Sequence, residues 1–215
     1  MPPAKTYRIE TNRVVVRCYE PNDVQMLSDA ITASVDHLRP WMPWVKDEPI
    51  SLEERVMLLR RFRGQFDLGE DYVFGIFNTS ETELLGSTGL HTRAGETARE
   101  IGYWIHVNHI GKGVATETVS ALTKVGFEIE DLTDITIQCS IANLPSQRIP
   151  EKLGYKLQQT AQQTVNDSNL STGKMIWKMS KTEYKQSPLR SVYIKTFDIL
   201  GKEIIAERFF SNDTA

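Results

Sequence analysis

Residues 100–118 read EIGYWIHVNHIGKGVATET, and this stretch decides the fold of the chain. A β-type run is followed by two glycines two positions apart, Gly111 and Gly113, and a helical pattern then begins at once. The helix is expected over residues 114–130, where one side carries Ala115, Val119, Leu122 and Phe127. A glycine turn at a helix start lets backbone N–H groups approach a bound phosphate closely. An ordinary tight turn between a strand and a helix explains the same two glycines equally well.

The sequence around this stretch predicts one mixed α/β (α+β) domain. Residues 134–141 alternate isoleucine and cysteine with polar residues, which indicates a second strand and completes a strand–helix–strand unit over 100–141. Residues 71–77, 83–91 and 99–107 are typical of a meander of antiparallel strands. The other expected elements are a strand over 11–19, helices over 21–38 and 51–66, a short helix from Pro145 to Gly154, and a hairpin of 155–165 with 175–179.

The sequence predicts that the C-terminal stretch is an addition to this domain. Residues 191–210 are rich in Ile and Phe and are expected to form a further hairpin that turns near Gly201. Because a two-stranded hairpin is marginal by itself, it should pack on the domain or on a second copy of the chain. We therefore predict one domain over residues 1–180 and an extension over 181–215, and whether the chain forms a homodimer stays open.

Composition excludes several classes of protein. The chain has 215 residues with 25 basic and 28 acidic side chains, a net charge of −3, so it lacks the concentrated basic face of a nucleic-acid binder. Its two cysteines, Cys18 and Cys139, form no CxxC pair and are expected to be reduced core residues. No apolar run is long enough for a signal peptide or a membrane span, and a cytoplasmic protein is expected.

The glycine loop does not match two common phosphate-binding motifs. A P-loop needs glycine five residues before the Gly-Lys pair and Ser or Thr after the lysine, and this chain has His106 and Gly113 there. A dinucleotide fingerprint needs a third glycine where Thr116 lies. The histidines form no HExxH pattern, so no metal site is expected.

The order and spacing of five segments resemble the Gcn5-related N-acetyltransferases, and within them the ribosomal-protein N-terminal (Rim-type) acetyltransferases. The segments are HLRPWMPWV, GSTGLH, EIGYWI, GKGVATE and NLPSQRIPEKLGY, and the resemblance covers roughly residues 8 to 180. It implies a twisted, mixed, mostly antiparallel sheet with helices on both faces. The strands at 100–107 and 134–141 would splay apart, with acetyl-CoA bound in the V between them.

The resemblance also implies which residues hold acetyl-CoA. The pyrophosphate would be held by the backbone of Gly111, Lys112, Gly113, Val114, Ala115 and Thr116. The main chain of Ile105, His106 and Val107 would pair with the pantetheine arm, and the Asn143 side chain would bind the same arm. No metal is implied.

For catalysis, the resemblance assigns Glu100 as the base that removes the amine proton through a bridging water. An ion pair of Glu100 with Arg93 or Arg99 is the structural alternative. Many relatives place an acidic tyrosine where this chain has Pro150, so Ser146 inherits the role of assisting departure of the thiolate. A proline there removes a backbone N–H and is expected to kink the helix near Ser146.

The resemblance implies an acetyl-CoA-dependent N-acetyltransferase that acts by direct attack of an amine on the thioester. It places Trp41 and Trp44 over the acceptor end of the site, although both rings could equally fold onto the core. A protein N-terminal α-amine is the expected acceptor, and a small polyamine or an aminoglycoside is the alternative. The absent tyrosine also leaves open a non-catalytic acyl-CoA-binding sensor.

Overall fold

A computed structural model gives the fold over residues 5–161 and 173–205. One nine-stranded sheet runs through it in the order β7-β8-β6-β5-β4-β3-β2-β1-β9. The strands are β1 (Arg8–Glu10), β2 (Val14–Cys18), β3 (Tyr72–Asn78), β4 (Leu84–His91), β5 (Ala98–Ile105), β6 (Asp134–Ser140), β7 (Lys156–Ala161), β8 (Lys174–Ser180) and β9 (Lys195–Phe197). All neighbours pair antiparallel except β5 and β6, which are parallel, and the predicted mixed, mostly antiparallel sheet is therefore confirmed.

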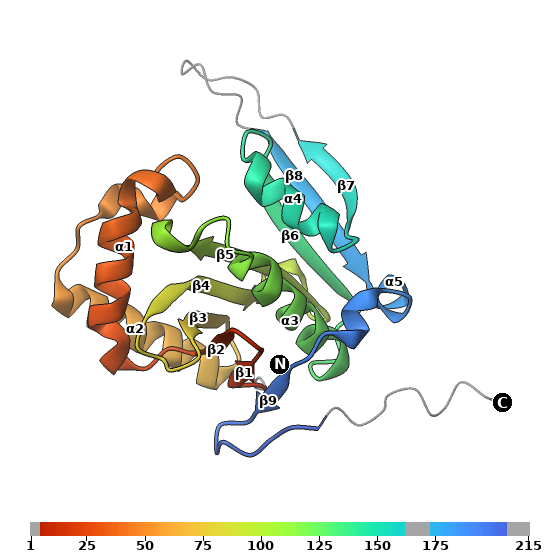
Figure 1. Ribbon diagram of the computed structural model, residues 1–215, viewed down its shortest axis with the longest axis horizontal. Coiled ribbons are helices and arrows are strands. Elements are labelled where there is room, and N and C mark those ends of the chain that lie inside the picture. Colours follow the sequence, from red (N-terminus) through yellow and green to blue (C-terminus); the bar gives the residue numbers. More distant parts are fainter. Residues whose placement is uncertain (1–4, 162–172, 206–215) are drawn as a thin grey trace.

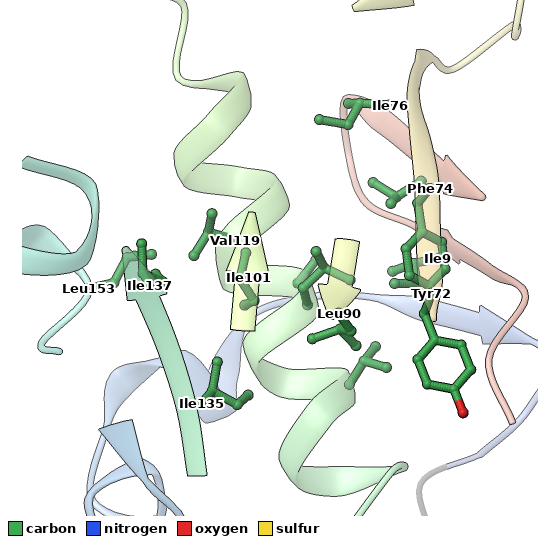
Figure 2. Packing of buried hydrophobic residues seen from close by; sticks show 14 of the residues in the cluster. Ile9, Tyr72, Phe74, Ile76, Leu90, Ile101, Val119, Ile135, Ile137 and Leu153 are labelled. Atoms are coloured by element: carbon green, nitrogen blue, oxygen red, sulfur yellow. The ribbon is translucent and has the colours of Figure 1, made fainter. Parts of the chain in front are cut away.

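Helices cover both faces of the sheet (Figure 1). They are α1 (Val24–Leu38), α2 (Leu52–Leu68), α3 (Val114–Glu128), α4 (Leu144–Lys152) and α5 (Lys181–Lys185), with short 3-10 turns between several of them. Leu27, Ile31 and Leu59 from α1 and α2 pack against one face. The apolar side of α3 packs against the other face, where Figure 2 shows Val119 together with Ile101 and Ile137.

The parallel pair β5–β6 opens partway along its length. Ala98 to Ile101 pair with Asp134 to Ile137, and the pairing then stops although β5 continues to Ile105. Strand β6 stays paired with β8 to its end, so β6, β8 and β7 turn away from β5 as one unit (Figure 1). The predicted splay between the two strands is thereby present.

Capping explains several helix boundaries. Ser51 caps α2 by accepting a hydrogen bond from the Glu54 N–H, while the Glu54 carboxylate accepts from the Ser51 N–H at 2.8 Å. Gly69, in the left-handed conformation, ends that helix. The Asn143 side chain caps α4 by accepting a hydrogen bond from the Ser146 N–H.

The N-terminal strand is present but shorter than predicted. Of the strand expected over 11–19, residues 14–18 form β2, whereas residues 11–13 form a turn in which the Thr11 N–H and hydroxyl both donate to the Val14 carbonyl, at 3.0 and 3.2 Å. The turn creates β1, which pairs with β2 on one side and with β9 on the other.

The C-terminal stretch adds β9 to the sheet edge at β1 and then turns. Gly201 has a φ of +74°, and the Ile204 N–H donates back to the Thr196 carbonyl at 2.7 Å. The later part of the predicted hairpin, residues 206–210, lies outside the described residues, as do residues 162–165 of the earlier one. The division at residue 180 stays a prediction.

Candidate functional site

The glycine loop presents the start of α3 without any side-chain cap. Gly111 and Gly113 adopt left-handed φ values of +72° and +82°, and a Cβ at Gly111 would meet nothing within 4 Å. Gly113 is the N-cap residue, so the first N–H groups of the helix, those of Val114 to Thr116, donate no hydrogen bond to a cap side chain. Unpaired N–H groups and the positive end of the helix dipole suit a phosphate at this position.

Charged side chains from the β1–β2 turn brace the loop. Arg13 donates from Nη1 to the Lys112 carbonyl at 3.0 Å and from Nε to the Glu117 carboxylate at 2.6 Å. The Thr11 hydroxyl donates to the same carboxylate at 2.6 Å. Both Arg13 and Lys112 are exposed, which places two cationic side chains beside the loop.

The free edge of β5 begins where β6 leaves it. The His106 N–H donates to the Leu85 carbonyl of β4 at 2.8 Å, and the Val107 N–H donates to Ser34 Oγ of α1 at 3.0 Å. Because successive residues of a strand point their N–H groups to opposite edges, the Ile105 N–H points to the open side. Of the three residues predicted to pair with pantetheine, Ile105 has this geometry, while His106 and Val107 use their N–H groups within the chain.

Glu100 is buried on the face of the sheet opposite α3. Only 7% of the residue is exposed, and both carboxylate oxygens are engaged: Arg93 Nη2 donates to Oε1 at 2.6 Å and Gln138 Nε2 donates to Oε2 at 2.8 Å. Arg99 points elsewhere and binds backbone carbonyls near its own turn. The carboxylate thus lies close to where the pairing of β5 and β6 ends, and it forms an ion pair with Arg93.

A second acid–base pair, which the sequence analysis did not identify, lies beside Glu100. His91 is directly opposite Glu100 across the β4–β5 ladder, and its Nδ1 is 2.9 Å from Asp71 Oδ2. Burial of Asp71 opposes ionisation, but the hydrogen bond and charge of His91 outweigh it and lower the pKa of the carboxyl. Asp71 precedes β3 and is 20 residues away in the chain, so only the strand register brings the two together.

The predicted tryptophans differ in position. Trp44 is 36% exposed, and its ring centroid lies 6.2 Å from that of Trp104, which is on the same face of β5 as Glu100. Trp41 is half-buried. A buried ion pair between Arg55 and Glu48, 2.6 Å apart, holds the loop that carries Trp44 against α2.

Ser146 is fixed on the other side of β5. Its Oγ is 3.0 Å from Tyr103 Oη, and its N–H donates to Asn143 Oδ1 at 3.2 Å. Burial raises the pKa of Tyr103 to about 12, so its hydroxyl keeps its proton at neutral pH. The contact of Tyr103 with Ser146 was not predicted from the sequence.

Pro150 lies inside α4, which continues from Leu144 to Lys152. A proline cannot donate to the carbonyl four residues before it, and that carbonyl belongs to Ser146. Tyr103 Oη donates to the Ser146 carbonyl at 3.2 Å. Tyrosine on β5 thus supplies the hydrogen bond that the proline withholds.

Among the described residues, no group of three or more His, Cys, Asp or Glu side chains is arranged to hold a metal ion. In the same part of the chain, no helix is both long and apolar enough to cross a membrane.

Comparison with known proteins agrees with this architecture. The sequence model of the acetyltransferase (GNAT) domain matches residues 13–156. The ribosomal protein uS5-alanine N-acetyltransferase of Escherichia coli (strain K12) is 27% identical over 155 residues, which cover 69% of this chain and 78% of that protein.

Solved structures share the fold at low sequence identity. Mycobacterium smegmatis RimJ, in complex with CoA-disulfide, superposes with a TM-score of 0.73 at 20% identity and covers 88% of this chain and 94% of that chain. RimL, a ribosomal L7/L12 alpha-N-protein acetyltransferase in complex with coenzyme A, gives 0.70 at 18% identity, covering 79% and 95%. The chain belongs to the Gcn5-related N-acetyltransferase (GNAT) family and is an acetyl-CoA-dependent N-acetyltransferase.

Proposed function

We propose that this enzyme acetylates the N-terminal α-amine of a protein, of the kind found on ribosomal proteins. The observation that carries the proposal is the buried Glu100 carboxylate, which lies where β5 leaves β6 and shares its sheet face with Trp104 and the exposed Trp44. A carboxylate attracts an ammonium group, and an exposed aromatic ring offers contact area to the first side chain of a peptide. The similarity to an alanine N-acetyltransferase of a ribosomal protein supports the same acceptor class.

Acetyl-CoA is the co-substrate, and each predicted residue has a proposed task toward it. The backbone N–H groups from Gly111 to Thr116 (Gly111, Lys112, Gly113, Val114, Ala115 and Thr116) bind the pyrophosphate. The main chain of Ile105, His106 and Val107 lines the pantetheine arm, with the Ile105 N–H free to donate, and Asn143 lies at the start of α4 beside it. The chemistry requires no metal.

The catalytic tasks fall to Glu100 and Ser146. Glu100 attracts the acceptor ammonium and promotes the loss of its proton, which leaves a neutral nitrogen to attack the thioester carbonyl. A main-chain N–H near Ile105 stabilises the charge that develops on the carbonyl oxygen. Ser146, hydrogen-bonded to Tyr103, assists departure of the thiolate.

The expected location of the enzyme follows from the acceptor class. A ribosomal-protein acceptor would be met in the cytoplasm, and neither nucleic acid nor a membrane takes part in the reaction. A homodimer stays a possible assembly, to be tested by the mass of the protein in solution.

A peptide panel tests the proposed acceptor. Peptides that begin with Ala, Ser, Met or Thr are compared with the same peptides blocked at the N-terminus but carrying a lysine, with spermidine, and with an aminoglycoside. We expect CoA thiol release and a single added acetyl group, by mass, on free N-termini only. Faster transfer to spermidine or the aminoglycoside would assign the small-molecule alternative. Binding of acetyl-CoA without thiol release from any amine would favour the sensor alternative.

A further inference from the structure

We propose that His91, oriented by Asp71, is the group that receives the proton of the acceptor amine. The inference rests on the proposed function, because it assigns a residue to the proton transfer that acetylation of an amine requires. His91 Nδ1 is 2.9 Å from one oxygen of Asp71 and 3.2 Å from the other. The Thr92 N–H also donates to this carboxylate, at 3.2 Å, and fixes its orientation.

The contact with Asp71 decides which nitrogen can act as a base. A carboxylate only accepts hydrogen bonds, so the neutral imidazole carries its proton on Nδ1 and leaves the lone pair on Nε2. Nε2 forms no hydrogen bond with any residue that the structure describes, and 17% of the side chain is exposed. Nε2 of His91 is therefore available to accept a proton from a substrate, as far as hydrogen bonds among the described residues are concerned.

Two glycines place this nitrogen at the opening of the sheet. Gly89 and Gly102 face each other across β4 and β5, and the His91 ring lies over them. A Cβ at Gly89 would be 2.7 Å from Nε2, and one at Gly102 would be 3.1 Å from it. Gly102 is the first residue of β5 beyond its pairing with β6. His91 thus reaches further toward the splay than Glu100 does.

Glu100 is less well placed to take a proton directly. Both of its oxygens already accept hydrogen bonds, from Arg93 and Gln138, and a proton would have to displace one of these donors. The charged groups that face His91 are Asp71 before β3, Glu100 on β5 and Arg93 after β4. Two carboxylates and one guanidinium leave an excess of negative charge, which favours a cationic acceptor at this position.

The proton balance gives each group one task. The acceptor enters as an ammonium with three protons on nitrogen, and the amide product keeps one. One proton passes to His91 Nε2, which returns it to solvent after the product leaves. The neutral nitrogen then forms the N–C bond, the C–S bond breaks, and the second proton ends on the CoA thiol. Glu100 keeps its charge throughout and holds the ammonium near His91.

The pH profile of acetyl transfer tests this assignment, with whichever amine the wild-type enzyme acetylates. His91→Gln should lower kcat/KM for the acceptor about 100-fold near pH 7 and leave the acetyl-CoA dissociation constant within about threefold. The wild-type rate should level off at a lower pH than the rate of the variant, because the wild-type enzyme supplies its own base. The variant should keep rising about tenfold per pH unit until the α-amine itself titrates near pH 8.

Matched variants and a second readout complete the test. Asp71→Asn should also lower the rate, whereas His37→Gln, at the end of α1, should not change it. Nitrogen-15 NMR of the histidine side chains should find the proton of neutral His91 on Nδ1, a measurement that needs no acceptor. An unchanged pH profile in His91→Gln, or a proton on Nε2, would overturn the proposal. Absence of thiol release in the wild type would instead reject the proposed function, and the tautomer would still decide whether His91 is the oriented base.

Discussion

From Glu100 to Ile105, the side chains of β5 alternate between a face that carries charge and an apolar face. On the first face, Glu100 is ion-paired with Arg93 of the turn after β4 and hydrogen-bonded to Gln138 of β6, and Trp104 follows toward the open end. On the second face, Ile101, Tyr103 and Ile105 pack with the core under α3, and only Tyr103 has a polar atom. Acetyl transfer requires the nitrogen to lose protons and the sulfur to gain one. Because β5 lies between the two faces, the group that accepts a proton and the group that donates one can be kept apart.

The two faces also differ in how they hold their polar groups. The charged face holds ionised groups with direct partners, as in the Arg93–Glu100 pair at 2.6 Å. The apolar face holds a neutral pair, Tyr103 with Ser146, and burial keeps the tyrosine protonated by raising its pKa to about 12. Substitutions on the two faces should therefore slow acetyl transfer to different extents.

The largest effect is expected on the charged face, from Glu100→Gln. Gln keeps the size of the side chain but removes its charge, so the rate constant for acetyl transfer should fall about 100-fold or more. Acetyl-CoA affinity should stay within about threefold, because cofactor contacts lie further along the strand. Single-turnover rates and titration of acetyl-CoA measure the two quantities, and higher pH should restore part of the rate.

Glu96→Gln is the matched control, since Glu96 is an exposed carboxylate just before β5. Full turnover of Glu100→Gln near pH 7 would mean that Glu100 is only a structural partner of Arg93. A joint loss of turnover and acetyl-CoA affinity would indicate that the substitution disturbs the sheet.

A smaller effect is expected on the apolar face, from Tyr103→Phe. This change removes the hydroxyl that contacts Ser146 and should slow transfer about 20-fold, less than a direct proton donor contributes. Ser146→Ala should give a similar loss, and the double variant should be no slower than the slower single variant, because both changes break one contact. Additive losses, measured as single-turnover rates, would mean that the two hydroxyls act independently.

The glycine loop lies outside both faces and should affect binding instead of transfer. Gly113→Val forces a β-branched residue into a φ of +82°, and its side chain would meet Arg13 Nη2 at 3.2 Å from Cβ. We expect the acetyl-CoA dissociation constant to rise about tenfold or more, measured by calorimetry on folded protein. Gly64→Ala, on α2 with open space around it, is the control. Unchanged acetyl-CoA affinity in a folded Gly113→Val variant would show that the loop is not part of the acetyl-CoA site.

The parts of the site that depend on local sequence could be predicted, and the glycine loop is the clearest case. The strand before it, the glycines and the helix after it are contiguous, so spacing alone gives their arrangement. The contacts on the two faces depend on distant residues. His91 meets Asp71 only through the β3–β4 pairing, and Tyr103 meets Ser146 across 43 residues. No periodic pattern of apolar and polar residues in the sequence indicates such contacts.

The side of the sheet formed by β1 and β9 was harder to predict for a related reason. Strands β1 and β9 have three residues each, too few for an alternating pattern to stand out. They are held by pairing with each other and by hydrogen bonds such as Tyr7 N–H to the Phe197 carbonyl at 2.8 Å. The central strands are longer and buried, and their positions were predicted within a few residues.

The smallest effect is expected from Pro150→Ala, which tests how the apolar face compensates for the proline. Alanine restores an N–H four residues after Ser146, so the Ser146 carbonyl gains its helical partner and no longer depends on Tyr103. A regained hydrogen bond contributes about 1 kcal/mol, and loss of a proline from the chain costs about as much through the unfolded state. The single variant should therefore melt close to the wild type, with a transfer rate within about threefold.

The informative measurement is a double-mutant cycle with Tyr103→Phe, which by itself leaves the Ser146 carbonyl without the donor it has in the native protein. We expect Tyr103→Phe to be less destabilising when Pro150→Ala is present, and the cavity left by the proline ring cancels because it occurs in both arms of the cycle. The transfer rate should not recover, since the Tyr103 contact with Ser146 Oγ stays absent. Additive changes in melting temperature would show that the tyrosine does not replace the missing N–H. Recovery of rate together with stability would mean that Tyr103 acts on catalysis only by positioning the backbone of α4.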